Sequence, residues 1–187
     1  ALILNEGWAT FSAEGATLPT LDCHGLDLRQ LNLADAEWPG SNLSEADLSG
    51  VSWSRVNLRG ANLSKAQLQG IDLSGANLTD VNFSGANLSG ANLSGATLER
   101  ANLDQTILTN ATFENATLNS ASLNQARGDD INFEGAQLLN AHISDSQFNR
   151  LKAHHCGLGG ARVTNLIAQD ADLTGIEARS TSWRSCA

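Results

Sequence analysis

The chain has 187 residues, which suits one domain or one repeat array, and its net charge of −9 argues against a surface that binds nucleic-acid phosphates. It contains no Tyr or Met, and aromatic residues make up 5%, so we do not expect a core of large aromatic side chains. No run of 18 apolar residues predicts a membrane span, and residues 1–15 lack the pattern of a signal peptide. We therefore expect a cytoplasmic protein that contacts no membrane.

From Ala1 onward the sequence consists of five-residue blocks that never lose phase. The third position is Leu, Ile, Val, Phe or Trp in 31 of 37 blocks, the first is most often Ala, and the fifth holds 13 of the 17 glycines. An α-helix would rotate successive third positions by about 140°, and a flat strand would invert alternate blocks because five is odd. A chain that turns once per block instead points every first and third residue toward one axis. The pattern therefore predicts a solenoid.

The other positions of the block fit the turns of such a solenoid. Asn or Asp is common at the second position, where its side chain can bond the backbone across the turn, and Ser or Thr at the fourth can do so more weakly. Glycine at the fifth position supplies a positive φ where the turn requires it. We expect the first and third residues to be buried and the other three to face water.

Charge pairs indicate how many blocks close one coil. Opposite charges outnumber like charges at a separation of 20 residues, whereas like charges are in excess at 15 and 25. The six opposite pairs are Asp35/Arg55, Glu45/Lys65, Asp80/Arg100, Asp130/Arg150, Arg150/Asp170 and Lys152/Asp172. A column of Asn42, Asn62, Asn82 and Asn102 has the same spacing, and stacked amides can bond one another. The sequence predicts one all-β domain over residues 1–187, a parallel β-helix of about nine four-sided coils.

The N-terminal part departs from this pattern in bulk and in charge. Residues 1–20, like 176–187, are predicted to be irregular terminal coils. Large residues at both inward positions, Leu21, Leu26 and Leu31 with Trp38 and Trp53, predict a wider or distorted coil that either plugs the end or docks a partner.

Acidic residues dominate the same part of the chain. Residues 1–50 have a net charge of −7. The candidate partner-binding acidic end consists of Asp22, Asp27, Asp35, Glu37, Glu45 and Asp47. These residues occupy several outward phases, so the alternative is a solvated surface that surrounds the rod.

Further along the chain, three features raise the question of a chemical site. Gly128 empties a third position, which predicts a local bulge. His142, His154 and His155 lie near Cys156, but Cys156 has an inward phase and both later histidines point outward, so we predict no metal site. His154 is expected to pair with Glu134, twenty residues earlier. Cys23 also has an inward phase, and both cysteines are expected to be reduced core residues.

The consensus blocks resemble the pentapeptide-repeat family over residues 16–183. They lie at 46–50, 61–65, 76–80, 86–90, 91–95, 101–105 and 171–175. The resemblance implies a right-handed quadrilateral β-helix. Well-understood members resemble duplex DNA in shape and charge, bind DNA gyrase or topoisomerase IV, and protect them from quinolones. Those members typically dimerise through a C-terminal helix, and some carry long loops. Here the register runs unbroken to 181–185 without insertions, which disfavours that role.

The function expected from these observations is that of a non-catalytic scaffold or protein-interaction module, with no cofactor and no metal. The alternative is a DNA-mimicking binder of gyrase. The partner is expected to be a protein, and the chain to be a monomer or to associate weakly end to end, with the Trp8 and Trp183 ends as candidates. Any specific role is expected where the pattern weakens, near residues 21–55 and 126–160.

Overall fold

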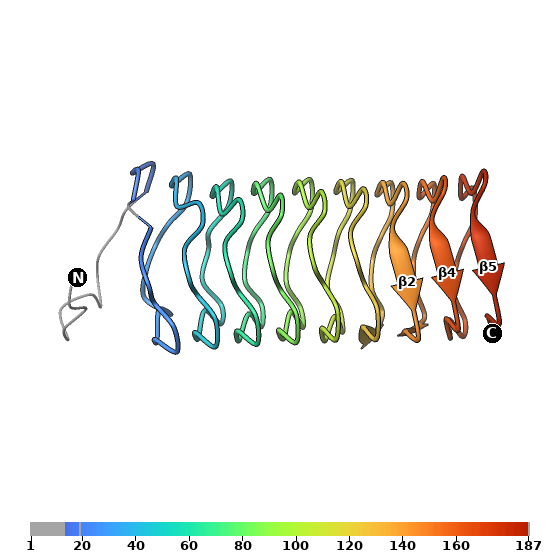
Figure 1. Ribbon diagram of the computed structural model, residues 1–187, viewed down its shortest axis with the longest axis horizontal. Coiled ribbons are helices and arrows are strands. Elements are labelled where there is room, and N and C mark those ends of the chain that lie inside the picture. Colours follow the sequence, from blue (N-terminus) through green and yellow to red (C-terminus); the bar gives the residue numbers. More distant parts are fainter. Residues whose placement is uncertain (1–13, 19, 187) are drawn as a thin grey trace.

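The chain winds coil upon coil along one axis and forms a rod (Figure 1). The computed structural model describes residues 14–18 and 20–186. Parallel backbone pairings join residues twenty apart along the rod, from Thr17 with Glu37 to Arg162 with Ser182, although none joins Asn32 with Ser52. The predicted all-β coil of four five-residue blocks is confirmed, and a period of twenty agrees with about nine coils for 187 residues.

Regular strands are short and belong to the C-terminal third of the rod. They are β1 (Arg127–Asp129), β2 (His142–Ser144), β3 (Gln147–Asn149), β4 (Arg162–Thr164) and β5 (Ser182–Arg184). β1 pairs with β3, and β2, β4 and β5 lie side by side in that order, all parallel. On the preceding coils the pairing between neighbours is a single bridge at the second position of each block. Each side of the rod is therefore a narrow parallel ladder.

Every backbone N–H of a consensus block has a partner, as residues 82–86 illustrate. Asn82 N donates to Ala61 O on the preceding coil (3.0 Å), and Phe83 N and Gly85 N donate to Asn102 O and Asp104 O on the following coil (2.7 and 2.9 Å). Ala86 N closes the turn on Phe83 O at 2.8 Å. The fourth N–H, that of Ser84, donates to the Asn82 side-chain Oδ1 at 3.0 Å. Asn at the second position thus satisfies the one donor that neither neighbouring coil reaches.

From Asp35 onward the fifth residue adopts a positive φ whether or not it is glycine. Gly85 has a φ of 69°, and Asp80 and Arg100 have φ values of 59° and 55°. The left-handed region costs a non-glycine residue about 1–2 kcal/mol. Asp80 N and Arg100 N, like Gly85 N, donate to carbonyls of the next coil at 2.9 Å. The ladder therefore holds the turn in place where the residue itself does not favour it.

First and third residues fill the axis of the rod, as the sequence predicts. Ala and Leu at these positions are buried along residues 36–163, and the outward residues are half-buried or exposed except for Ser44 and Gly157, which are buried. Burying one Leu stabilises the fold by about 1.5–3 kcal/mol. The rings of Phe113 and Phe133 stack at 4.8 Å between centroids, one coil apart. Cys23 and Cys156 are buried and unpaired, and burial raises their pKa to about 11 and about 12.

The bulky N-terminal coils keep the same register. Bridges join Asp22 to Asn42 and Asp27 to Asp47, twenty residues apart as elsewhere. The Trp53 side chain is fully buried, and its Nε1 donates to Leu31 O at 2.7 Å. The indole of Trp53 thus bonds the carbonyl that would be expected to accept the backbone N–H of Ser52, and among the described residues no pairing joins Asn32 and Ser52. The coil is therefore distorted locally where the two large inward residues meet, as the sequence predicts.

The predicted bulge at Gly128 is wrong. Gly128 is the central residue of β1 and pairs with Phe148 of β3 in the normal register. A Cβ atom at this position would lie 2.6 Å from the backbone carbon of Leu108 and from Thr109 N. The glycine therefore permits a close approach between two coils at a block position that carries a large side chain in 31 of 37 blocks.

Four of the predicted charge pairs form contacts between neighbouring coils. They are Asp35–Arg55 (2.5 Å), Glu45–Lys65 (3.4 Å), Asp80–Arg100 (2.7 Å) and Asp130–Arg150 (2.7 Å). In the other two pairs one partner is engaged elsewhere. Arg150 also contacts Asp129 at 3.2 Å, and Asp172 bonds His154 and Thr174. The pairs are exposed and screened by solvent, so they contribute little to stability and serve mainly to identify the register.

Replacement of Asn82 tests the role of the second position. Asn82→Ala leaves Ser84 N–H without its side-chain acceptor, and we expect a loss of about 1–2 kcal/mol in the free energy of unfolding, measured in urea. Amide hydrogen exchange at Ser84 should accelerate. Asn82→Asp keeps an acceptor oxygen and should remain close to the wild type, whereas equal losses in both variants would contradict this role.

Replacement of Gly128 tests the close approach of the coils. Gly128→Ala should lower the free energy of unfolding by about 1–3 kcal/mol, because its Cβ overlaps the Leu108 backbone. A Gly128→Ala variant as stable as the wild type in urea would show that a flexible bulge exists there after all.

Candidate interaction surfaces

The structure does not bring the six acidic candidates together. Their positions fall on all four sides of the rod, and each engages a neighbour. Asp22 accepts from Asn42 Nδ2 (2.7 Å), Asp27 and Asp47 contact Arg29 (2.7 and 3.4 Å), Asp35 contacts Arg55 (2.5 Å), Glu37 accepts from Asn57 Nδ2 (2.5 Å), and Glu45 contacts Lys65 (3.4 Å). A hydrogen bond from Arg29 lowers the pKa of Asp27 to about 2, and one from Arg55 lowers the pKa of Asp35.

One side of the rod carries the predicted asparagine column, and we call it the asparagine face. It consists of the blocks whose second residues are Asp22, Asn42, Asn62, Asn82 and Asn102, which are bridged in that order. Asn42 Nδ2 donates to Asp22 Oδ1 at 2.7 Å, and Asn62 and Asn82 each donate to the preceding Asn Oδ1 at 3.3 Å. The stacked amides predicted from the sequence are confirmed along this part of the column.

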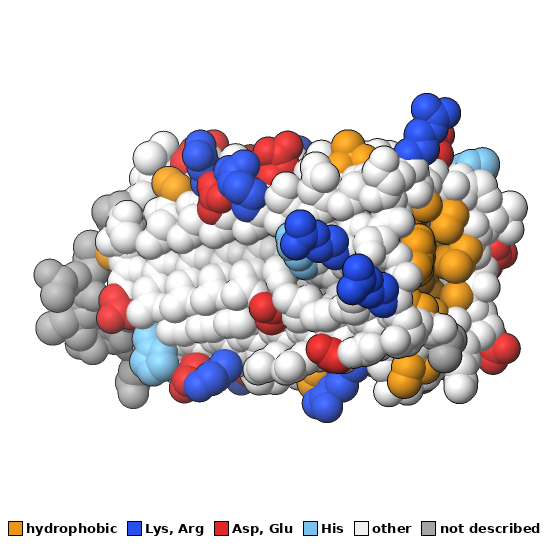
Figure 2. Space-filling view, turned by 45° about the vertical axis from the view of Figure 1, so that its right-hand side comes forward, with side chains coloured by type: hydrophobic (Ala, Val, Ile, Leu, Met, Phe, Trp, Pro, Cys, Tyr) orange, Lys and Arg blue, Asp and Glu red, His pale blue; other side chains and the backbone are white. Residues whose placement is uncertain are grey.

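The side chains of the asparagine face are held in place before any partner arrives. Each Asn from 42 to 102 is half-buried and accepts the N–H of the fourth residue of its own block. Ser64 and Ser84 lie beside the column and are also half-buried. Figure 2 shows a broad uncharged stretch along the rod, with charged side chains gathered at its margins. Ordered side chains lose little rotamer freedom on binding, which favours a surface that docks a partner.

In the histidine group, His154 contacts a carboxylate and Cys156 is buried. His154 Nε2 lies 2.7 Å from Asp172 Oδ2 on the following coil, so the expected pairing with Glu134 is wrong. Hydrogen bonds from Thr174, and then the one from His154, lower the pKa of Asp172 to about 2. Cys156 is buried at 2% exposure. Within residues 14–18 and 20–186 no three His, Cys, Asp or Glu side chains are grouped so as to hold a metal ion.

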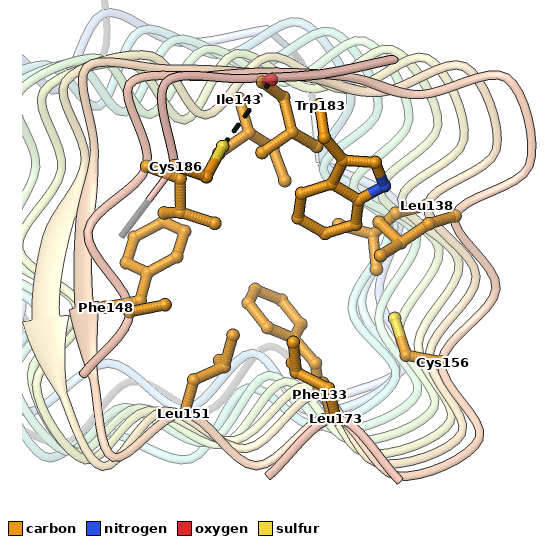
Figure 3. Close-up of a pocket in the computed structure, with 14 residues that line it drawn as sticks. Phe133, Leu138, Ile143, Phe148, Leu151, Cys156, Leu173, Trp183 and Cys186 are labelled. Atoms are coloured by element: carbon orange, nitrogen blue, oxygen red, sulfur yellow. Dashed lines mark hydrogen bonds between the residues drawn. The ribbon is translucent and has the colours of Figure 1, made fainter. Parts of the chain in front are cut away.

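The C-terminal end of the rod contains an apolar cavity that the sequence reasoning missed. Its volume is about 280 Å³, and it opens where the last coil ends (Figure 3). Phe133, Phe148 and Leu151 lie around it, and Trp183 and Leu173 stand at its mouth with 39% and 37% of their surface exposed. The signal in the sequence was Ala in place of a large residue at the third positions 153, 168 and 178.

Among the residues that the structure describes, no helix is long and apolar enough to cross a membrane. The Trp8 end, which we considered for association, lies outside the described residues.

Comparisons with known proteins agree with the fold. The family model described as pentapeptide repeats matches eight copies over residues 22–52, 41–80, 76–115 and 96–127. HetL, a pentapeptide repeat protein involved in heterocyst differentiation regulation from the cyanobacterium Nostoc sp. strain PCC 7120, is 27% identical, with 94% of this chain and 90% of that chain covered and a TM-score of 0.40. No curated protein sequence matches the chain.

Two further solved structures are similar. A trypsin-treated variant of QnrB1, a plasmid-mediated fluoroquinolone resistance protein, is 17% identical, with 93% and 91% of the two chains covered and a TM-score of 0.57. The pentapeptide repeat protein Rfr23 from the cyanobacterium Cyanothece 51142 is 23% identical, with 92% and 87% covered and a TM-score of 0.41.

The family model covers more than half of the chain, and the twenty-residue ladder accounts for the repeat. The expected right-handed quadrilateral β-helix is thereby confirmed. The chain belongs to the pentapeptide-repeat family.

Proposed function

We propose that the protein is a non-catalytic interaction module that docks another protein on its asparagine face. The observation that carries this proposal is the fixed ladder of outward side chains from Asp22 to Asn82, in which each rung bonds both its own turn and a neighbour. Such a ladder presents the remaining amide hydrogens and the serine hydroxyls at a regular spacing of about 4.8 Å. A partner with polar groups on a flat surface would match it at little entropic cost.

The charges near this face indicate that a partner would be held there by hydrogen bonds and shape more than by electrostatic attraction. The exposed Glu45–Lys65 ion pair, at 3.4 Å, occupies the fifth positions beside the column. Neighbouring opposite charges cancel at a distance, so the face offers a partner hydrogen bonds and shape more than net charge. Affinity should therefore depend only weakly on ionic strength.

The gyrase-directed alternative has less support. DNA mimicry needs a continuous negative side, but residues 51–100 and residues 151–187 each have a net charge of +1. Many acidic side chains are also paired, as Asp35 and Asp80 are with Arg55 and Arg100. The likeness to QnrB1, at 17% identity, concerns the fold alone. We therefore do not propose gyrase as the partner.

The test uses paired substitutions on two sides of the same rod. Ser64→Arg with Ser84→Arg places bulk and charge on the asparagine face and leaves the Asn side chains in place. Ser74→Arg with Ser94→Arg is the matched control at the equivalent block positions of another side. Arg already occupies this block position at Arg59, so both pairs should fold. In pulldowns from the source cell, we expect one protein to be retained by wild type and control and reduced at least tenfold by the first pair.

Two results would overturn the proposal. One is the absence of any protein that wild type retains above a bare matrix. The other is an equal loss with both substitution pairs, while circular dichroism and urea unfolding show that both remain folded.

A further inference from the structure

The side of the rod that carries the asparagine face becomes basic toward its C-terminal part. Its column of second residues continues from Asn102 through Ser122 and His142 to Arg162 and Ser182, each bridged to the next. β2, β4 and β5 form this part of the side as one parallel sheet. Figure 2 shows Lys or Arg side chains that stand out beyond the uncharged stretch. The amide ladder is therefore followed by a surface of a different chemistry.

Two pairs of residues on β4 and β5 form what we call the arginine patch: Arg162 with Ser182, and Thr164 with Arg184, paired in register. All four are outward residues of their blocks, and none is fully buried. The arginines occupy one diagonal of the patch and the hydroxyl groups occupy the other. Neighbouring strands lie about 4.8 Å apart and two residues along a strand span about 6.6 Å, so the two arginine Cα atoms are separated by about 8 Å.

The arginine patch has no counter-charge within the described part of the rod. Three arginines elsewhere each contact an acid twenty residues earlier: Arg55, Arg100 and Arg150. The residue twenty positions before Arg162 is instead His142, and the one before Arg184 is Thr164. Among residues 14–18 and 20–186, no hydrogen bond or ion pair engages the side chains of the patch. Its guanidinium and hydroxyl donors are therefore available to an anion.

Two acids border this part of the side, and both are engaged. Asp145 follows β2 and accepts a hydrogen bond from Asn165 Nδ2 at 2.8 Å. Asp104 accepts hydrogen bonds from Ser122 Oγ and Asn124 N at 2.5 and 2.8 Å. These acids confine the basic surface to a short length, and the net charge of −9 repels a long polyanion such as a nucleic acid. The surface suits a short anionic group instead.

We propose that the arginine patch binds an extended acidic segment of a partner protein, in which two carboxylates are separated by one residue. Side chains at alternate positions of an extended segment point the same way and lie about 6.6 Å apart, close to the spacing of the two arginines. Each guanidinium holds its N–H donors in a planar fork that matches a carboxylate, and the neighbouring hydroxyl adds a further donor. The bound segment crosses β4 and β5 diagonally, from Arg162 to Arg184.

The arginine patch is a site separate from the asparagine face. Three bridges along the column lead from Asn102 to Arg162, and no asparagine side chain of that face takes part in the patch. Binding through two charge-assisted pairs should weaken as salt is added, whereas the docking proposed above depends little on ionic strength. The two proposals can therefore fail independently.

Fluorescence anisotropy tests the site with a labelled peptide that carries two aspartates separated by one threonine. We expect saturable binding to the 187-residue chain and at least tenfold weaker binding to Arg162→Gln with Arg184→Gln. Arg127→Gln with Arg179→Gln is the matched control and should bind like the wild type. These two arginines are exposed on other sides of the rod and form no ion pair among the described residues, and their loss changes the net charge equally.

Two further probes define the anion. A peptide whose aspartates are separated by two residues directs them to opposite faces when it is extended, and it should bind about fivefold more weakly. Inorganic phosphate supplies the charge without the spacing and should not compete at the concentrations at which the peptide binds. Absence of saturable peptide binding, equal weakening by the two arginine pairs with both variants folded by circular dichroism, equal binding of the two peptides, or equally tight binding of phosphate would each overturn the proposal.

Discussion

The structure depends on the requirement that every backbone N–H in a chain with one turn per five residues finds an acceptor. Three of the five donors in a block reach neighbouring coils, one closes the turn, and the fourth-position N–H depends on the side chain of the second residue, as in Asn82. This arrangement of the five backbone donors explains why the second position of the block prefers Asn or Asp. It also explains why the spacing between coils cannot vary. Local satisfaction of the backbone fixes the geometry of the whole rod.

In a rod built in this way, the surfaces that can bind a partner are its sides and its ends. Inward residues fill the axis completely over most of its length, and outward residues are held one coil spacing apart by their neighbours. The asparagine face and the C-terminal end are the two places where this regularity leaves something unfilled: amide hydrogens on the face, and an apolar cavity at the end.

Much of the fold could be predicted from the sequence because it repeats. The twenty-residue period followed from charge pairs such as Asp80 with Arg100, and the stacked asparagines followed from their spacing. Gly128 was misread because a missing side chain in the pattern suggests a defect, whereas the structure shows a backbone approach that only glycine permits. His154 was assigned to Glu134 by spacing alone, but its flexible side chain reaches Asp172, eighteen residues later.

The candidate surfaces were less predictable than the fold. The outward phases of the acidic residues already predicted that they surround the rod, but the neighbour that each one contacts was seen only in the structure. The cavity is lined by small residues on two neighbouring coils, Ala153 and Ala168, and neither block alone predicts it. Features that follow from the five-residue block could be predicted from the sequence. Features that depend on how side chains of several coils meet were found only in the structure.

The central claim is that the coil closes every twenty residues, and spin labels test it most directly. Labels at positions 57 and 77 would stand one coil apart on the same side, whereas labels at 57 and 72 would stand on different sides. The predicted result is strong dipolar broadening of the electron paramagnetic resonance spectrum for the first pair and weak broadening for the second. Equal broadening of the two pairs, or stronger broadening at a separation of 15, would contradict the four-sided coil.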